Sequence, residues 1–172
     1  KKKKKRSIKT FTVTVASKTA AHRYNGSGSS NGYKIDGKEA PFLTLTPGRT
    51  YKFDQSEISN SGHPFLFYLE ANKTTAYTTN VTTNGTAGSS GAYTQIVVGD
   101  TTPMVIHYQC SSHSLMGNSV ATNSATATGT LLSSLSVSGN MDVTGTFTVS
   151  DNILMTGTGA IDIAAGTTAQ RP

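Results

Sequence analysis

Residues 103–117 read PMVIHYQCSSHSLMG. Apolar and polar side chains alternate through the first half of this segment, and a period of two residues is typical of a β-strand with one buried face. The pattern predicts a strand over residues 104–109. The side chains assigned to its inner face are those of Met104, Ile106, Tyr108 and Cys110. We therefore expect Cys110 to lie at the carboxy-terminal end of this strand, with its side chain on the buried face.

Five further segments alternate in the same way, and turn-forming pairs such as Pro-Gly, Asn-Gly and Gly-Asp separate them. They are residues 10–16, 42–45, 50–53, 64–69 and 93–98. Thr, Ser, Gly and Asn make up 75 of the 172 residues, a composition that favours strands and tight turns. No apolar stripe of period 3.6 extends beyond two turns, which argues against an α-rich domain. The sequence predicts an all-β protein with an antiparallel Greek-key β-sandwich.

The formal net charge of +6 comes from the amino-terminal end of the chain. The chain has 15 Lys and Arg against 9 Asp and Glu, and its first six residues are all basic, so the remainder is balanced. We interpret residues 1–9 as a solvated basic segment. Since no basic pattern continues beyond it, we expect no nucleic-acid partner. No apolar run approaches the ~20 residues needed to cross a bilayer, so we expect no membrane insertion.

The composition of the sequence changes near residue 121, where small polar residues replace the alternating apolar segments. Together with the basic segment at the start, this change divides the chain into four parts. The basic segment 1–9 precedes a sandwich over 10–120, a small polar linker over 121–132 and a repetitive part over 133–172. Residues 135–163 read LSVSGNMDVTGTFTVSDNILMTGTGAIDI, in which short alternating segments are separated by Gly- and Asn-containing turns. One such chain cannot close a core, so we expect an extended β-rich stalk of three identical chains, continuing beyond residue 172. A disordered tail is the alternative interpretation.

Four side chains have the chemistry of a copper site. Cys110, His113 and Met116 are spaced as Cys-x2-His-x2-Met, and His63 lies 47 residues upstream, just before a predicted strand. A thiolate, two imidazoles and a weak axial thioether are the ligands of blue-copper centres. Each residue also has a simple structural interpretation: a small hydrophobic Cys, a Met that fills the end of the sandwich, and a His in a turn. Two other histidines, His22 and His107, are predicted to be exposed and outside the site.

Residues 40–120 resemble a cupredoxin domain. The resemblance rests on LTLTPGRTYKF at 43–53, SGHPFLF at 61–67 and YQCSSHSLM at 108–116. It implies a Greek-key sandwich and, when metal is bound, copper held by His63, Cys110, His113 and Met116. The gap between His113 and Met116 is shorter than in plastocyanin-like members. It is closer to the binuclear copper loop of oxidase subunits, but the second Cys of that loop is absent.

The chain also resembles virion structural proteins of marine tailed phages, especially those that infect cyanobacteria. This similarity rests on the segments around His63 and Cys110, on TTNGTAGSSGAYT at 82–94, and on the tail-fibre-like residues 137–149 and 157–172. It implies a tail fibre or fibre-like appendage of the virion, with other virion proteins and the host cell surface as partners. A secreted blue-copper electron-transfer protein with a carboxy-terminal tether is the alternative. Because no paired carboxylates, phosphate loop or Ser-His-Asp set is evident, we expect no enzyme activity.

Overall fold

The computed structural model describes residues 8–124, which form a nearly all-β unit. The chain divides into two compact units, residues 1–133 and 134–172, and the described residues belong to the first. The predicted stalk and most of the predicted basic segment and linker lie outside the described residues. Within the described part, one short 3₁₀ turn, η1 (Ile58–Asn60), accounts for the helical content, which confirms the all-β prediction. No helix there has the length and apolarity needed to cross a bilayer.

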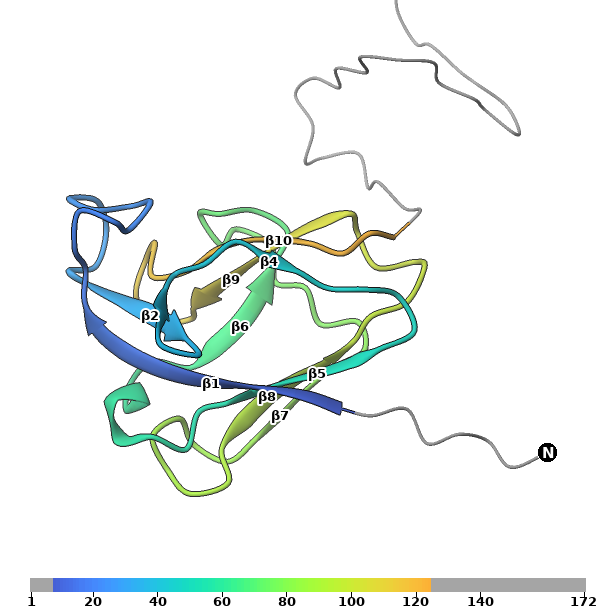
Figure 1. The fold of residues 1–172 in the computed structure, drawn as a ribbon, viewed down its shortest axis with the longest axis horizontal. Coiled ribbons are helices and arrows are strands. Elements are labelled where there is room, and N and C mark those ends of the chain that lie inside the picture. Colours follow the sequence, from blue (N-terminus) through green and yellow to red (C-terminus); the bar gives the residue numbers. More distant parts are fainter. Residues whose placement is uncertain (1–7, 125–172) are drawn as a thin grey trace, which may run out of the picture. The chain divides into compact units, whose positions relative to one another are not determined.

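Within residues 8–124, ten strands form two sheets (Figure 1). The larger sheet has the order β3-β2-β1-β5-β8-β7, and the smaller has the order β4-β10-β9-β6. The bounds of the strands in the larger sheet are β1 Ile8–Ser17, β2 Asn31–Ile35, β3 Lys38–Glu39, β5 Thr50–Asp54, β7 Val81–Asn84 and β8 Tyr93–Val97. Those in the smaller sheet are β4 Leu43–Thr44, β6 Phe65–Tyr68, β9 Val105–Cys110 and β10 Asn118–Ala121.

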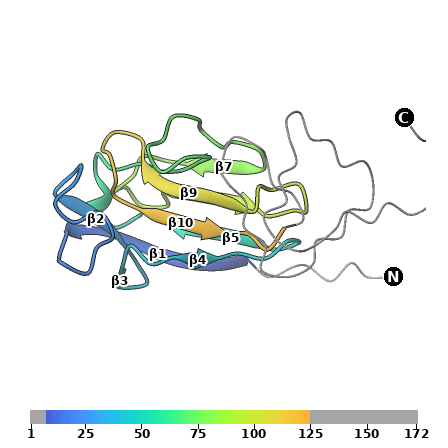
Figure 2. The same cartoon turned by 90° about the horizontal axis from the view of Figure 1, so that it is seen from above.

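Two parallel pairings interrupt the antiparallel pattern of the sheets. Strand β1 runs parallel to β5, with Phe11 opposite Phe53, and antiparallel to β2. Strand β10 runs parallel to β4 and antiparallel to β9. Each parallel pair joins segments far apart in the sequence, and Figure 2 shows β1 and β4 lying along the same side of the molecule. The arrangement is β-sandwich-like, with the inner faces of both sheets supplying one core.

Each of the six predicted strands corresponds to an observed strand, with ends shifted by up to two residues. Four strands were not predicted: β2, β3, β7 and β10. Strand β2 begins inside the Gly-, Ser- and Asn-rich stretch of residues 25–32, and β10 extends to the first residue of the predicted linker. Each of these strands is at most five residues long and carries no more than two apolar side chains, so its hydrophobic alternation is too short to stand out. Their pairing with neighbouring strands supplies the order that the sequence pattern does not.

An aromatic cluster occupies the space between the sheets. The Phe53 and Phe65 rings stack with centroids 4.6 Å apart, and Phe65 stacks on Tyr108 at 5.2 Å. Phe53 lies in the larger sheet, while Phe65 and Tyr108 lie in neighbouring strands of the smaller one. All three side chains are fully buried. Stacking across the sheets stabilises their packing by about 0.5–1.5 kcal/mol a pair beyond simple burial. The cluster adjoins the candidate site, because Phe65 lies opposite Cys110 and Tyr108 precedes Cys110 by two residues in β9.

Candidate metal centre

Strand pairing brings His63 beside Cys110 although 47 residues separate them. Cys110 is the last residue of β9 and lies opposite Phe65, the first residue of β6. The Ser111 amide continues the pairing by donating to the Pro64 carbonyl at 3.1 Å. His63 therefore immediately precedes the strand that pairs with the Cys110 strand, and both side chains lie at the same end of the smaller sheet.

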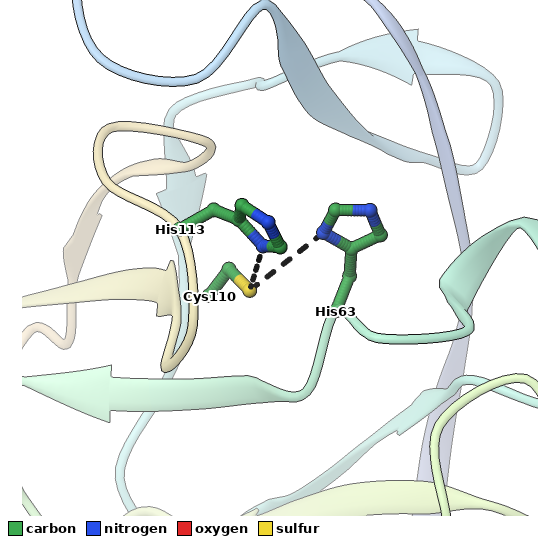
Figure 3. Close-up of side chains that lie close together, drawn as sticks. All are labelled: His63, Cys110 and His113. Carbon is green, nitrogen blue, oxygen red and sulfur yellow. Dashed lines mark hydrogen bonds between the residues drawn. The ribbon is translucent and has the colours of Figure 1, made fainter.

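Three of the four predicted ligands converge (Figure 3). The Sγ atom of Cys110 lies 3.8 Å from Nδ1 of His63 and 3.6 Å from Nδ1 of His113. The ring centroids of the two histidines are 4.5 Å apart, and one ligand atom from each of the three residues lies within 4.8 Å of the others. The side chains thus enclose a common point from three directions.

These separations fit a bound metal ion. An ion bonded to sulfur at about 2.3 Å and to nitrogen at about 2.05 Å holds these atoms about 3.6 Å apart at the tetrahedral angle and about 3.8 Å apart at 120°. The observed sulfur–nitrogen distances of 3.6 and 3.8 Å match these expected separations. The ligand chemistry agrees, because thiolate and imidazole bind copper, zinc and related ions. The group could therefore hold one metal ion without moving the strands.

The three ligand side chains differ in exposure to solvent. Cys110 is fully buried, His63 is half-buried and His113 is exposed. Burial, and then the nearby His113, lower the pKa of His63 below its ordinary value of 6.5. A neutral imidazole is the form that binds metal, so this shift favours ligation at neutral pH. The site has a buried thiol on its inner side and one imidazole open to solvent.

Met116, the fourth predicted ligand, is completely buried within the same hydrophobic core as Cys110. It follows Leu115, whose φ of 57° places the backbone in the left-handed region. The Met116 carbonyl accepts hydrogen bonds from the Tyr33 amide at 2.8 Å and from Nε2 of His22 at 3.2 Å. These contacts fix the backbone of the loop after His113. The role of the Met116 sulfur as an axial ligand stays a prediction.

A network of buried side chains forms hydrogen bonds with the backbone of His63. The His63 carbonyl accepts hydrogen bonds from the Tyr33 hydroxyl at 2.8 Å and from Nε2 of Gln55 at 2.9 Å. Oε1 of Gln55 accepts from the Phe65 amide at 3.0 Å, so the Gln55 amide group contacts both sides of Pro64, which has no N–H of its own. The Asn60 carbonyl accepts from the His63 amide at 2.8 Å. The backbone of His63 is thereby fixed at both ends.

The loop between β1 and β2 contacts the segment that carries His113. The Ser29 amide donates to the Ser114 carbonyl at 3.0 Å. The backbone also approaches closely at Gly28, where an added Cβ would lie 2.7 Å from the same carbonyl and φ is +65°. This Gly- and Ser-rich loop therefore packs against the loop that carries His113. Its contribution has no local sequence signature, because it acts through backbone groups.

The sequence predicted that His22 and His107 are exposed, and the structure differs from this prediction for both. His22 is buried, with 3% of its surface exposed, and its two ring nitrogens contact the Met116 carbonyl and the Tyr24 amide. Gly32 makes room for the His22 ring, since an added Cβ would lie 2.6 Å from it. His107 is half-buried and contacts the Ser119 hydroxyl at 3.2 Å. The prediction of exposure was wrong for His22 because its hydrogen-bond partners come from distant segments.

Lys73 adds a positive charge at the end of the Cys110 strand. Its ammonium group donates to the Cys110 carbonyl at 3.1 Å and to the Ser111 carbonyl at 2.8 Å. The residue has a φ of 58°, so its backbone lies in the left-handed region. Charge-assisted hydrogen bonds of this kind are shorter and stronger than neutral ones. They fix the backbone between the two ligand residues Cys110 and His113.

We expect the metal-free chain to lose stability as pH falls below about 6.5. Burial is the largest cause that lowers the pKa of His22, His63 and His107 below the ordinary value of 6.5. The unfolded chain therefore binds more protons than the folded chain in this range, and acid favours unfolding. Urea unfolding at pH 7.5 and pH 5.5 measures the effect. The variant His22→Gln should show a smaller difference between the two pH values, and a difference equal to wild type would contradict this role for His22.

Comparisons of the chain with known protein families, with curated proteins and with solved structures give no match.

Proposed function

We propose that residues 8–124 form a cupredoxin-like Greek-key domain that holds a mononuclear copper ion through His63, Cys110 and His113. The observation that carries this proposal is the convergence of one thiol and two imidazoles at ligand distances from each other. Copper is favoured over zinc because the donor set is three-coordinate and a thioether, Met116, follows in the same loop. Structural zinc sites usually have four protein ligands.

The chain's own residues supply the rigidity that such a centre needs. Two strands and a buried hydrogen-bond network fix Cys110 and His63 before any metal binds. When bound, copper would supply one-electron redox chemistry, and a rigid ligand set keeps the reorganisation on electron transfer small. The buried thiol excludes water from one side, while His113 leaves an imidazole edge open to solvent.

Addition of Cu(II) to the full chain tests the copper site. We expect one equivalent to bind and to give the intense visible absorption of a copper thiolate, with no such absorption on addition of Zn(II). Metal analysis of the natively produced protein complements this titration. Binding of zinc but not copper, or of neither, would contradict the proposal.

We further propose that this domain is part of a virion structural protein, a tail fibre or fibre-like appendage of a tailed phage, and that it has no enzyme activity. The observation that supports this is the low-charge, repetitive sequence of residues 133–172 together with the segments that resemble phage proteins. A trimeric stalk would assemble with other virion proteins and display the domain, including to a host cell surface. Copper would then have a structural role or a redox role at the particle surface.

The second candidate is a secreted blue-copper electron-transfer protein, which the exposure of His113 favours. Two measurements separate the candidates. Sedimentation of the full chain at micromolar concentration should give a trimer, and mass spectrometry should detect the chain in purified phage particles. A monomer that is absent from particles would favour the electron-transfer protein instead.

A further inference from the structure

The sequence contains three Asn-Gly pairs, and the structure places them in different surroundings. The pairs are Asn25-Gly26, Asn31-Gly32 and Asn84-Gly85. In such a pair the glycine amide nitrogen can attack the side-chain carbonyl carbon of the asparagine, because no glycine side chain hinders the approach. The attack needs an unpaired amide and an asparagine side chain that is free to rotate. Local structure therefore decides which of the three pairs reacts.

Asn25 and Gly26 are the exposed central residues of a turn. The Ser27 amide closes this turn by donating to the Tyr24 carbonyl at 3.1 Å. Gly26 has a φ of +76°, as the third residue of a type II turn requires, and an added Cβ there would meet nothing within 4 Å. Within residues 8–124, the Gly26 amide and the Asn25 side chain form no hydrogen bond. Both reacting groups are therefore free.

Open space and a positive charge adjoin this turn. Residues 25–30 and Lys18 line a cavity of about 400 Å³, so water can reach the pair. The Lys18 ammonium group donates to the Tyr24 carbonyl at 3.0 Å and to the Ser27 carbonyl at 2.7 Å, on either side of the pair. A cation in this position stabilises the negative charge that forms on the Gly26 nitrogen when it loses its proton. The surroundings of the turn thus favour the attack.

The other two pairs are held in strands. Gly32 lies in β2 and is buried, with the His22 ring 2.6 Å from the position of an added Cβ. Asn84 is the last residue of β7, and its Nδ2 atom donates to the Gly91 carbonyl at 2.9 Å. Either pair must leave its strand before the glycine nitrogen can reach the side chain, and that opening costs free energy. The structure therefore protects these two pairs and leaves Asn25 unprotected.

We propose that Asn25 is a site of spontaneous deamidation, at which the folded chain gains a negative charge. The Gly26 amide nitrogen loses its proton to water and forms a bond to Cγ of Asn25. The bond between Cγ and Nδ2 breaks, and Nδ2 leaves as ammonia. Water then opens the resulting succinimide ring and gives aspartate or iso-aspartate at position 25. Water is the co-reactant, and nothing is oxidised or reduced.

The modified turn belongs to the loop that contacts the segment carrying His113. In that contact the Ser29 amide donates to the Ser114 carbonyl at 3.0 Å. Iso-aspartate directs the backbone through the former side chain and so lengthens it by a methylene group. The new carboxylate also lies in a loop that has no other acidic residue between positions 25 and 32. We expect deamidation to weaken the hydrogen bond between Ser29 and Ser114.

Ageing of the full chain at mildly alkaline pH, followed by fragment-ion mass spectrometry, tests this proposal. Trypsin leaves Asn25 and Asn31 in one peptide, residues 24–34, so one control lies beside the site and Asn84 supplies the other. We expect a mass gain of about 1 Da at position 25, because oxygen replaces an NH group. Its rate should be at least about tenfold higher than at either control. In urea the three rates should become similar, because local structure no longer distinguishes the pairs.

Similar rates at all three positions in the folded chain would overturn the proposal. Conversion of Asn25 in urea but not in the folded chain would overturn it as well. The variant Asn25→Gln tests the effect on the loop, because a glutamine side chain forms the corresponding ring far more slowly. Hydrogen exchange of the Ser29 amide should become faster as wild type ages and stay constant in Asn25→Gln. An unchanged rate in both would contradict the effect on the loop, and none of these results depends on the copper site.

Discussion

Replacement of Cys110 by Ser is expected to abolish the copper-thiolate absorption and to weaken copper binding more than a hundredfold. Removing even an outer partner of a metal ligand costs about 10- to 100-fold in affinity, and Cys110 is itself the ligand with the softest donor atom. Its sulfur lies within 3.8 Å of both Nδ1 atoms, so it is the ligand atom that lies beside both imidazoles. Absorption spectra and competition titrations with a Cu(II) chelator measure the two effects.

A second variant separates the role of Cys110 from that of Met116. Met116→Leu keeps a buried apolar side chain of similar volume and should retain the copper-thiolate absorption. A modest change in its spectrum would support axial ligation by the thioether, and an unchanged spectrum would show that Met116 only fills the core. Strong copper-thiolate absorption in Cys110→Ser would rule out Cys110 as the ligand. Circular dichroism of both variants without metal checks that the fold persists.

Substitution of Gly117 by Ala is expected to have the largest effect on stability. Gly117 lies between Met116 and β10, and an added Cβ would lie 1.8 Å from the Tyr108 carbonyl oxygen and 2.6 Å from the Tyr108 ring. Neither neighbour can move freely, because Tyr108 lies in the middle of β9 and is fully buried. Strands β9 and β10 would have to separate. We expect a loss of more than about 3 kcal/mol in the free energy of unfolding, measured by urea denaturation of the metal-free chain.

Gly99 provides the control for this substitution. An added Cβ at Gly99 meets nothing within 4 Å, and its φ lies outside the left-handed region that favours glycine. Gly99→Ala should therefore change the free energy of unfolding by no more than about 0.5 kcal/mol. Equal stabilities of the two variants would contradict the close packing at Gly117. A Gly117→Ala chain that remains folded should bind copper more weakly than wild type does, because the displaced strand β10 follows directly after the loop that carries His113.

Alternation and ligand spacing were enough to predict the strands that build the site. Strand β9 buries Ile106, Tyr108 and Cys110 on the predicted inner face, although Met104, assigned to the same face, is exposed and Gln109 is buried as well. A turn of two residues after Cys110 leaves His113 little freedom to point elsewhere. The convergence of His63, Cys110 and His113 was predicted from these local features and is confirmed as a group that could hold metal. The choice of copper depends on the ligand chemistry and stays a prediction.

The supporting residues could not be predicted from the sequence. Gln55 and Tyr33 both bond the His63 carbonyl, but Tyr33 is 30 residues away and on the other sheet. A buried polar residue has no periodic pattern of its own, and its partner depends on which strands are neighbours. The two parallel pairings could not be predicted either, because no local feature of the sequence indicates that β1 lies beside β5 or that β10 lies beside β4. Only the assembled core determines these contacts.

The pairing of β10 with both β4 and β9 has a consequence for when the centre can form during synthesis. The smaller sheet joins residues 43–44 to residues 118–121, so it stays incomplete until nearly the whole domain has left the ribosome. Such long-range pairings form slowly, because a long loop must close before the contacts stabilise it. A nascent chain that already contains Cys110 and His113 but lacks β10 would carry all the ligands without their arrangement. Metal loading would therefore follow release of the domain, and newly made protein would pass through a thiol-exposed stage vulnerable to oxidation.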